Sequence, residues 1–316
     1  MSSAPPLAPA APSAAGASRA WVGPLLAVTG AIAFSGKAII VKLGYRHTLA
    51  GGAEPVDALT LVMLRMLVAL PFFMLLAWWG GRGRPGLTRR ELAAVAALGF
   101  SGYYLASTLD FLGLQYISAS LERLILYITP TVVVLLSQWL FGRRATRGQW
   151  LAMGLAYVGL LLVFGRELHF EGPRVALGAG LVLASTLSYA LYMIYSGEWV
   201  RRIGAQRLAG WASAVACALC LAQFVALRPL ATLAAVPAPV WWLSIVNGTL
   251  CTVAPVLMVM MAIERIGSAR ASQLGMIGPI ATILMGVVWL DEPLTGWLVA
   301  GTLCVLGSVA WLARLK

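Results

Sequence analysis

Ten long apolar runs constrain the fold of this chain more than any motif within it. Each holds about 20 residues, enough for a helix rising 1.5 Å per residue to cross a hydrocarbon core of about 30 Å. The runs cover approximately residues 21–43, 58–79, 91–115, 119–141, 149–165, 175–199, 208–227, 240–263, 268–290 and 295–313. Only 11% of the residues are charged, against about 25% in soluble domains. The sequence therefore predicts an all-α polytopic membrane protein with ten transmembrane helices.

A stretch in the second half of the chain repeats the spacing of glycine and proline found in a stretch of the first half. Gly248 follows Gly99, and Pro279 follows Pro130, at the same spacing of 149 residues. Such a repeat indicates two related halves. Because each half holds five helices, an odd number, the second half must start on the opposite side of the membrane. The repeats are then inverted around a central cavity. We expect a disordered cytoplasmic tail at 1–20, five-helix repeats at 21–165 and 175–316, and a linker at 166–174.

Basic residues are distributed unevenly over the connectors between the runs. With the N-terminus in the cytoplasm, fifteen Lys and Arg residues fall on the cytoplasmic side and five on the other. This is the bias of the positive-inside rule, and a wrong helix count would scramble it. The formal net charge of +12 is therefore a signal of topology. The sequence contains no basic patch interleaved with aromatic residues, so nucleic acid is not expected as a partner. Both termini are expected in the cytoplasm.

Five charged side chains fall inside the predicted helices, namely Lys37, Arg65, Asp110, Glu122 and Arg123. A charge deep in a bilayer costs roughly 2.5–3.5 kcal/mol on insertion scales, so it must be paired, snorkel to the interface or line water. In a buried charge network, Asp110 and Glu122 would neutralise two of the three bases, leaving one base over. A surplus base in a wet cavity could receive a substrate carboxylate, and Lys37 is our candidate. The alternative is that Lys37 belongs to the network.

Helical spacing on the fourth and ninth predicted helices selects a surface for the central cavity. Further candidates come from the third, sixth and eighth predicted helices and from Lys37 on the first. The candidate binding residues are Lys37, Tyr103, Ser107, Tyr127, Ser188, Tyr189, Thr252, Gln273 and Met276. Rings with hydroxyls and one amide would suit a mostly apolar zwitterion, although each tyrosine also fits a packing role. Pro130 and Pro279 each remove a backbone hydrogen bond and kink their helices, as hinges or as static bends.

An enzyme is not expected from this sequence. The only histidines, His47 and His169, lie in predicted outer loops, and no nucleophile motif, zinc motif or phosphate loop occurs. The four cysteines lie inside apolar runs, where C-x-x-C spacing only places two small side chains on one helix face. We therefore expect no catalytic residues, no metal site, no disulfide and no cofactor.

Several short elements resemble the drug/metabolite transporter superfamily, in particular its EamA-type branch. They are Tyr127-Ile-Thr-Pro130, Ile277-Gly-Pro279 and Trp289-Leu-Asp-Glu-Pro-Leu-Thr-Gly-Trp297, the last being similar to the family's Leu-Gly-Glu element. In the first half this element reads Leu140-Phe-Gly-Arg143, which leaves only one acidic copy. The resemblance covers roughly residues 21–313. It is nearest to bacterial inner-membrane exporters of amino acids, including aromatic ones.

The resemblance implies a multi-pass secondary transporter of the bacterial inner membrane. The inverted repeats imply that it works by alternating access, and a bundle of ten helices is large enough to act as a monomer. It would export or exchange a small metabolite, with aromatic or other neutral amino acids as the first candidates. A carrier of a sugar, a nucleotide derivative or a drug-like solute is the alternative within transport. A membrane-embedded enzyme or a receptor is the alternative outside it. The first predicted helix lacks the acidic residue with which small multidrug pumps bind cations, which disfavours an antiporter of cationic drugs.

Overall fold

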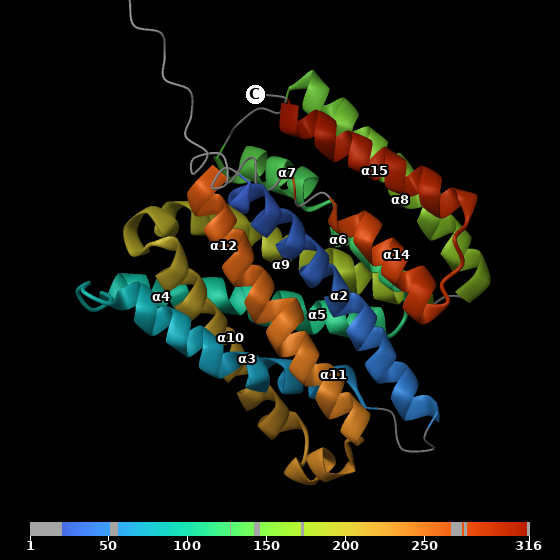
Figure 1. The fold of residues 1–316 in the computed structure, drawn as a ribbon. Coiled ribbons are helices and arrows are strands. Elements are labelled where there is room, and N and C mark those ends of the chain that lie inside the picture. Colours follow the sequence, from blue (N-terminus) through green and yellow to red (C-terminus); the bar gives the residue numbers. More distant parts are fainter. Residues whose placement is uncertain are drawn as a thin grey trace, which may run out of the picture.

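The computed structural model describes residues 21–50, 56–126, 128–141, 146–171, 174–266, 274 and 277–314. Every regular element within these ranges is helical (Figure 1). In chain order the elements are α2 (Val22–Ala50), α3 (Ala58–Gly81), α4 (Arg89–Gly99), η1 (Phe100–Leu105), α5 (Ala106–Leu114), α6 (Ala119–Leu126), α7 (Thr129–Phe141), α8 (Arg147–Glu171), α9 (Arg174–Ile203), α10 (Ala205–Leu227), η2 (Leu230–Ala235), α11 (Ala238–Gly248), η3 (Thr249–Val253), α12 (Ala254–Ile266), α14 (Gly278–Leu290) and α15 (Gly296–Arg314).

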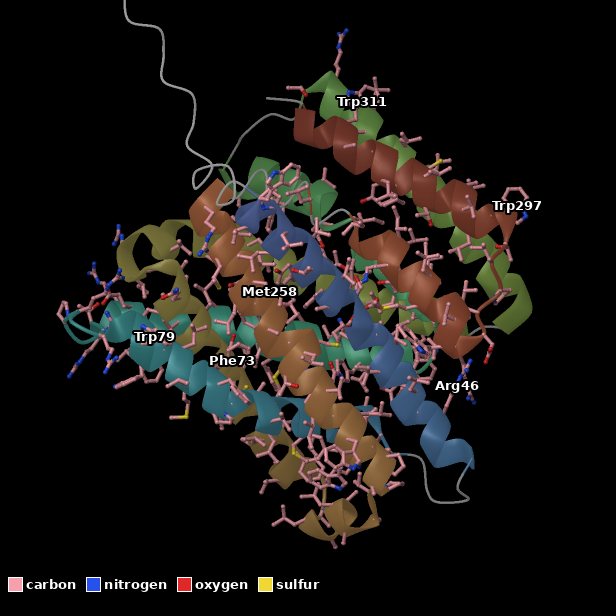
Figure 2. The ribbon with its side chains drawn as sticks, in the orientation of Figure 1. Arg46, Phe73, Trp79, Met258, Trp297 and Trp311 are labelled. Carbon is pink, nitrogen blue, oxygen red and sulfur yellow. The ribbon has the colours of Figure 1, made fainter. Side chains whose placement is uncertain are left out.

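Six helical segments of the described chain are long and apolar enough to cross a membrane. They are Val22–Arg46, Ala58–Gly81, Arg89–Leu114, Arg174–Ser196, Ala205–Leu227 and Ala238–Val259. Shorter apolar helices cover Trp150–Gly159, Ile280–Leu290 and Gly296–Ser308. Exposed tryptophans lie near helix ends, among them Trp79, Trp297 and Trp311 (Figure 2), as expected for side chains that anchor at the two interfaces of a bilayer. The all-helical membrane class predicted from the sequence is confirmed.

Two of the membrane-crossing segments contain a π-helical turn at equivalent positions. The π-helix η1 joins α4 to α5, and the π-helix η3 joins α11 to α12. Each follows a glycine, Gly99 or Gly248, and these glycines are 149 residues apart. A Cβ at Gly99 would lie 2.5 Å from the Ala212 carbonyl oxygen, and one at Gly248 would lie 2.9 Å from the Arg65 carbonyl oxygen. Glycine therefore allows the helices before both π turns to approach the opposite half.

The prolines mark a second repeated interruption. Pro130 is the second residue of α7 and Pro279 the second residue of α14, where the missing backbone N–H removes no intrahelical bond. Each proline therefore stands at the start of a described helix, and the expected kink of a longer helix stays a prediction. Single turns precede both, with Ile128 N–H donating to Ile125 O at 3.0 Å and Ile277 N–H donating to Leu274 O at 3.4 Å. The hinge role of both prolines stays a prediction.

The most extensive helix contacts join the first half of the chain to the second. α3 packs on α10 and α8 packs on α15, and each of these pairs consists of equivalent helices. Three further contacts between the halves occur in exchanged pairs: α2 with α12 and α9 with α5, α2 with α14 and α9 with α7, and α3 with α11 and α10 with α4. Figure 1 shows α2 lying between α12 and α14. The two halves therefore share their packing surfaces.

The largest buried apolar cluster draws on both halves, with Phe73, Phe111, Phe224, Val240 and Leu290 among its members. Polar contacts tie α3 to α10 beyond both ends of the pair. At one end Asp57 caps α3 and accepts from Nε of Arg228 at 2.7 Å. Burial raises the pKa of Asp57, but hydrogen bonds from Thr60 and Arg228 outweigh it and hold this pKa below its usual value. At the other end Nη1 of Arg84 donates to Ile203 O at 2.7 Å.

The close approach of α10 to α3 predicts that an added methyl group separates them. A Cβ at Gly210 would lie 2.5 Å from the Ala77 amide nitrogen, whereas a Cβ at Gly154 meets no atom within 4 Å. We expect Gly210→Ala to destabilise the protein by about 1–3 kcal/mol through overpacking and Gly154→Ala to leave stability unchanged or raised. Melting temperatures of the purified variants in detergent check this. Equal melting temperatures would contradict the packing described for α3 and α10.

Candidate functional site

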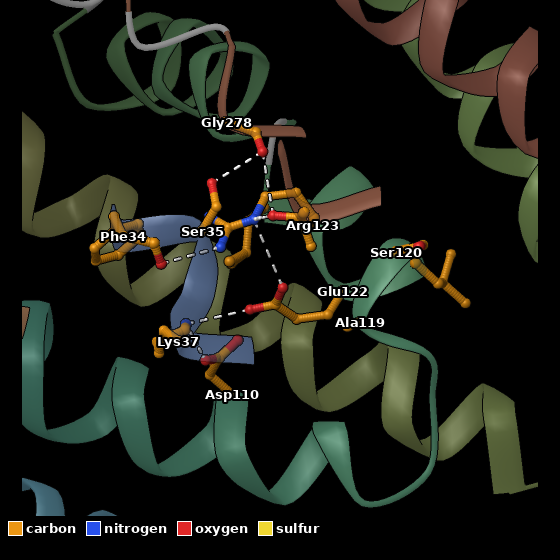
Figure 3. A network of polar contacts seen from close by, with 12 residues as sticks. Phe34, Ser35, Lys37, Asp110, Ala119, Ser120, Glu122, Arg123 and Gly278 are labelled. Carbon is orange, nitrogen blue, oxygen red and sulfur yellow. Dashed lines mark hydrogen bonds and ion pairs between the residues drawn. The ribbon is translucent and has the colours of Figure 1, made fainter. Parts of the chain in front are cut away.

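Four charged side chains form one buried cluster where α2, α5 and α6 meet (Figure 3). Lys37 Nζ lies 2.5 Å from Asp110 Oδ2 and 3.2 Å from Glu122 Oε1. Arg123 Nε lies 3.9 Å from Glu122 Oε2. None of the four residues is more than 5% exposed. This buried charge cluster, namely Lys37, Asp110, Glu122 and Arg123, holds two bases and two acids and is therefore neutral as a whole.

The buried charge cluster is anchored to the second half of the chain through the break before α14. Arg123 Nε donates to Thr282 Oγ1 at 2.9 Å, and Thr282 in turn donates to Gly278 O. Ser35 Oγ also donates to Gly278 O, at 2.9 Å. The ring of Phe34 lies 5.5 Å from Lys37 Nζ and 5.4 Å from the guanidinium carbon of Arg123, within the range of cation–π attraction. The start of α14 thus provides a carbonyl and a hydroxyl to a cluster built mainly by the first half.

Arg65 on α3 is also buried, at 5% exposed, but its surroundings differ. Its Nη2 donates to Ser107 Oγ at 2.9 Å, and its guanidinium carbon lies 5.0 Å from the centre of the Phe111 ring. Its Nε has no hydrogen-bond partner, and no carboxylate of the described residues forms an ion pair with it. The charge count from sequence correctly leaves one base over, but that base is Arg65 and not Lys37.

Tyrosines from both halves meet beside η1. The hydroxyls of Tyr103 and Tyr192 lie 3.1 Å apart, and their rings make an edge contact with centroids at 5.1 Å. Tyr189 stacks on Tyr192 at 5.6 Å and keeps 36% of its surface exposed. We call Tyr103, Tyr189 and Tyr192 the tyrosine cluster. It offers ring faces and hydroxyls to a ligand, and Tyr192, which contacts both other rings, is its centre.

Small hydroxyl side chains satisfy backbone carbonyls around the π turns. Ser188 Oγ donates to Ser101 O at 2.7 Å, and Ser185 Oγ donates to Ala106 O at 2.7 Å. At the equivalent turn Thr252 Oγ1 donates to Asn247 O at 2.8 Å. A π turn leaves carbonyls without their usual i→i−4 donors, and an apolar medium makes such orphans costly. Ser188 and Thr252, which were selected as cavity residues, therefore support the backbone in this conformation.

The structure distributes the candidate binding residues that it describes over four places. Lys37 lies in the buried charge cluster, Tyr103, Ser188 and Tyr189 gather around η1, Ser107 contacts Arg65, and Thr252 lies in η3. Tyr127, Gln273 and Met276 lie outside the described residues. Contact of any of these side chains with a substrate stays a prediction. Sequence reasoning missed Thr282 and Asn247, because a threonine or an asparagine inside an apolar run has no signal of its own.

Glu292, in the loop after α14, caps a helix of the other half. Its Oε1 accepts from the Ala119 backbone N–H at 2.9 Å, and its Oε2 accepts from Ser120 Oγ at 2.6 Å. A carboxylate at a helix N-terminus satisfies orphan donors and interacts favourably with the helix dipole. The acidic element similar to Leu-Gly-Glu therefore joins the second half to the first turn of α6. The position 149 residues earlier is Arg143, outside the described residues.

Comparison with known families agrees with this architecture. The model of the EamA-like transporter family matches the chain twice, at residues 21–165 and 176–314. The chain belongs to the EamA-like transporter family. It is accordingly a membrane transporter and not an enzyme.

Relatives of this transporter carry names of the same kind. It is 31% identical over 287 residues to the Uncharacterized transporter YcbK of Bacillus subtilis (strain 168), covering 87% of each chain. It is 23% identical to the Uncharacterized transporter sll1319 of Synechocystis sp., covering 92% of this chain and 93% of the other. A solved structure named "Crystal structure of protein" aligns with a TM-score of 0.62 at 18% identity, over 95% of this chain and 97% of the other. That likeness supports the fold.

The geometry of the buried charge cluster predicts a large effect of removing its central cation. Lys37→Met would leave Asp110 and Glu122 buried without their main partner, a loss of about 3–5 kcal/mol for such a pair. Replacing Asp110 by Asn as well should recover much of that loss. The measurement is unfolding by heat or SDS in detergent.

Arg46→Met is the matched control for this prediction. The Arg46 side chain lies near the far end of α2, is 51% exposed and pairs with Asp291 at 3.5 Å, so a change below about 1 kcal/mol is expected. Wild-type stability in Lys37→Met would contradict the pairing described here.

Proposed function

We propose that this transporter exports or exchanges small neutral amino acids, aromatic ones among them, across a bacterial inner membrane. It works by alternating access as a single chain of ten transmembrane helices, with both termini in the cytoplasm. The observation that carries the mechanism is the exchanged pairing of helices between the halves. Because three helix contacts between the halves each have an equivalent contact in which the halves swap roles, one chain can adopt two related arrangements that open to opposite sides.

The repeated interruptions support the same mechanism. The π turns η1 and η3 begin 149 residues apart, as do α7 and α14. Irregular backbone inside a membrane is tolerated where it is buried in protein or lines a water-filled cavity. In transporters with inverted repeats, discontinuous helices form the substrate site near the repeat interface. The four interruptions of this chain therefore favour a site between the halves.

The side chains around this interface favour an amino acid over a phosphorylated metabolite. The tyrosine cluster offers rings from both halves, with one of its rings partly open, which suits an apolar or aromatic side chain. Two of the three buried bases are already neutralised by Asp110 and Glu122. A phosphate would need two or more converging bases, whereas one carboxylate needs one. A neutral amino acid with an apolar or aromatic side chain suits the tyrosine cluster and carries a single carboxylate.

Reconstitution in liposomes tests the substrate. We expect uptake of labelled L-phenylalanine and L-leucine above that of protein-free liposomes, with faster uptake when the same unlabelled amino acid is inside. Sugars and nucleotide sugars serve as the comparison panel. Transport confined to that panel would leave the family assignment intact and refute the amino-acid proposal.

Accessibility of introduced thiols tests the inverted topology. In a background without the four native cysteines, R84C and R144C should both resist an impermeant reagent added outside cells, and R228C should react with it. The reason is that the first two lie on the expected cytoplasmic side and the third on the opposite side. Labelling of R84C and R144C from different sides would overturn the five-plus-five arrangement.

A further inference from the structure

The buried ionisable groups of the described chain leave one positive charge without an ion pair. Lys37 and Arg123 are paired with Asp110 and Glu122 inside the buried charge cluster. Arg65 is equally buried but forms no ion pair with a described residue. An uncompensated guanidinium inside a bilayer is unfavourable, and buried charges are normally paired or bound to an ion. An anion bound at this position would supply the counter-charge that no described residue provides as an ion pair.

The immediate surroundings of Arg65 fit a small ligand with one negative charge. The guanidinium has five N–H donors, yet Ser107 Oγ is the one oxygen atom of the described residues that accepts from it. Its Nε has no partner, and the Phe111 ring lies against the guanidinium at 5.0 Å. The planar fork of an arginine matches a carboxylate through two parallel hydrogen bonds. Neither Ser107 nor Phe111 is a second base, which a phosphate would need.

Arg65 lies at the junction of the two halves, where a transported solute has to pass. It is seven residues after Ala58, the first residue of α3, which is about 10 Å along the helix axis at 1.5 Å per residue. The Arg65 carbonyl oxygen lies 2.9 Å from the position of a Cβ on Gly248, directly before the π turn η3. The helix α3 also packs on α10 and α11 of the second half. The backbone of Arg65 is therefore next to one of the repeated interruptions.

A complementary acceptor is available on the neighbouring helix. Asn247 on α11 is 3% exposed, and its Oδ1 has no hydrogen-bond partner. Asn247 directly precedes Gly248, the residue that approaches Arg65. A buried amide oxygen without a donor suits an ammonium group, just as a buried guanidinium without an acceptor suits a carboxylate. One amino acid carries both missing groups.

We infer that Arg65 binds the carboxylate of the transported solute, and that this solute is a small monocarboxylate with an apolar body. The inference rests on the proposed function and names the residue that recognises its substrate. It assigns to Arg65 the role expected for Lys37, because Lys37 already has two carboxylate partners. Asn247 is the residue that recognises an ammonium group when the solute is an amino acid.

Ligand binding to purified full-length protein tests the role of Arg65, with L-phenylalanine and L-phenylalaninamide as matched probes. Wild type should bind the acid roughly 10–100-fold more tightly than the amide, the size expected of a charged hydrogen-bonded pair. R65Q should lose this preference, so that acid and amide bind with similar affinity. R65K should keep part of the preference, because an ammonium supplies the charge without the bidentate fork. Arg46→Gln, at an exposed arginine, should match wild type.

Three results would overturn the inference. The first is an undiminished preference for the acid in R65Q. The second is an equal loss of acid and amide binding in both R65Q and R65K, which a purely structural role would give. The third is stabilisation of wild type by sodium chloride as strong as that by carboxylates, which would make Arg65 a chloride site. Melting temperature without ligand checks folding: R65Q should equal or exceed wild type, whereas R123Q should fall below it. If R65Q does not insert, the comparison of R65K with wild type decides.

Ligand binding and transport in liposomes together separate this inference from the proposed function. If wild type binds no amino acid but binds phenylpyruvate or benzoate in an Arg65-dependent way, the carboxylate site stands and the amino-acid proposal fails. If wild type transports amino acids and R65Q does so with the same selectivity, the proposed function stands and the inference fails.

Discussion

The ion pairs between Lys37 and the two carboxylates, Asp110 and Glu122, are the interaction on which the rest of the structure depends. They join α2, α5 and α6 within the apolar interior, and Arg123 extends them to the start of α14 through Thr282. Charges of this kind are tolerated in lipid only when their partners are held in place. The cluster therefore fixes where the broken helix of the second half begins, and it neutralises every buried carboxylate of the described interior. Within the described interior, Arg65 is left as a buried cation without an ion pair.

The π turns and helix breaks also connect the fold to the proposed transport. Each π turn and each helix break creates carbonyls without an intrahelical donor, and the protein satisfies several of them with hydroxyl side chains such as Ser35, Ser188 and Thr252. The hydrogen bonds from Ser35 and Ser188 cross between the halves, whereas that of Thr252 stays within its own helical segment. At the first two sites, an irregularity of one helix is thus coupled to a contact between two helices. The same contacts place the tyrosine cluster, the buried charge cluster and Arg65 along the surfaces that the halves share.

Much of the fold could be predicted from sequence, because spacing and polarity act over whole helices. The offset of 149 residues between Gly99 and Gly248 predicted that these two sites are equivalent. The amino-acid sequence did not indicate that each is followed by a π turn. The prolines marked the breaks correctly, but their position as second residues of α7 and α14 depended on hydrogen bonds around Ile128 and Ile277. Counting charges showed that one base is in excess. Which base it is could not be counted, because that depends on the directions of side chains from separate helices.

The acidic cap at Glu292 makes the two halves energetically unequal. Its carboxylate fastens the end of α14 to the first turn of α6, whereas the equivalent position of the first half is Arg143. A guanidinium has no acceptor, so Arg143 cannot form the contact that Glu292 makes. Separating the loop after α14 from α6 would leave the Ala119 N–H and the Ser120 hydroxyl without this acceptor. The two copies of the repeat are therefore not interchangeable in energy, although their helices pair in equivalent ways.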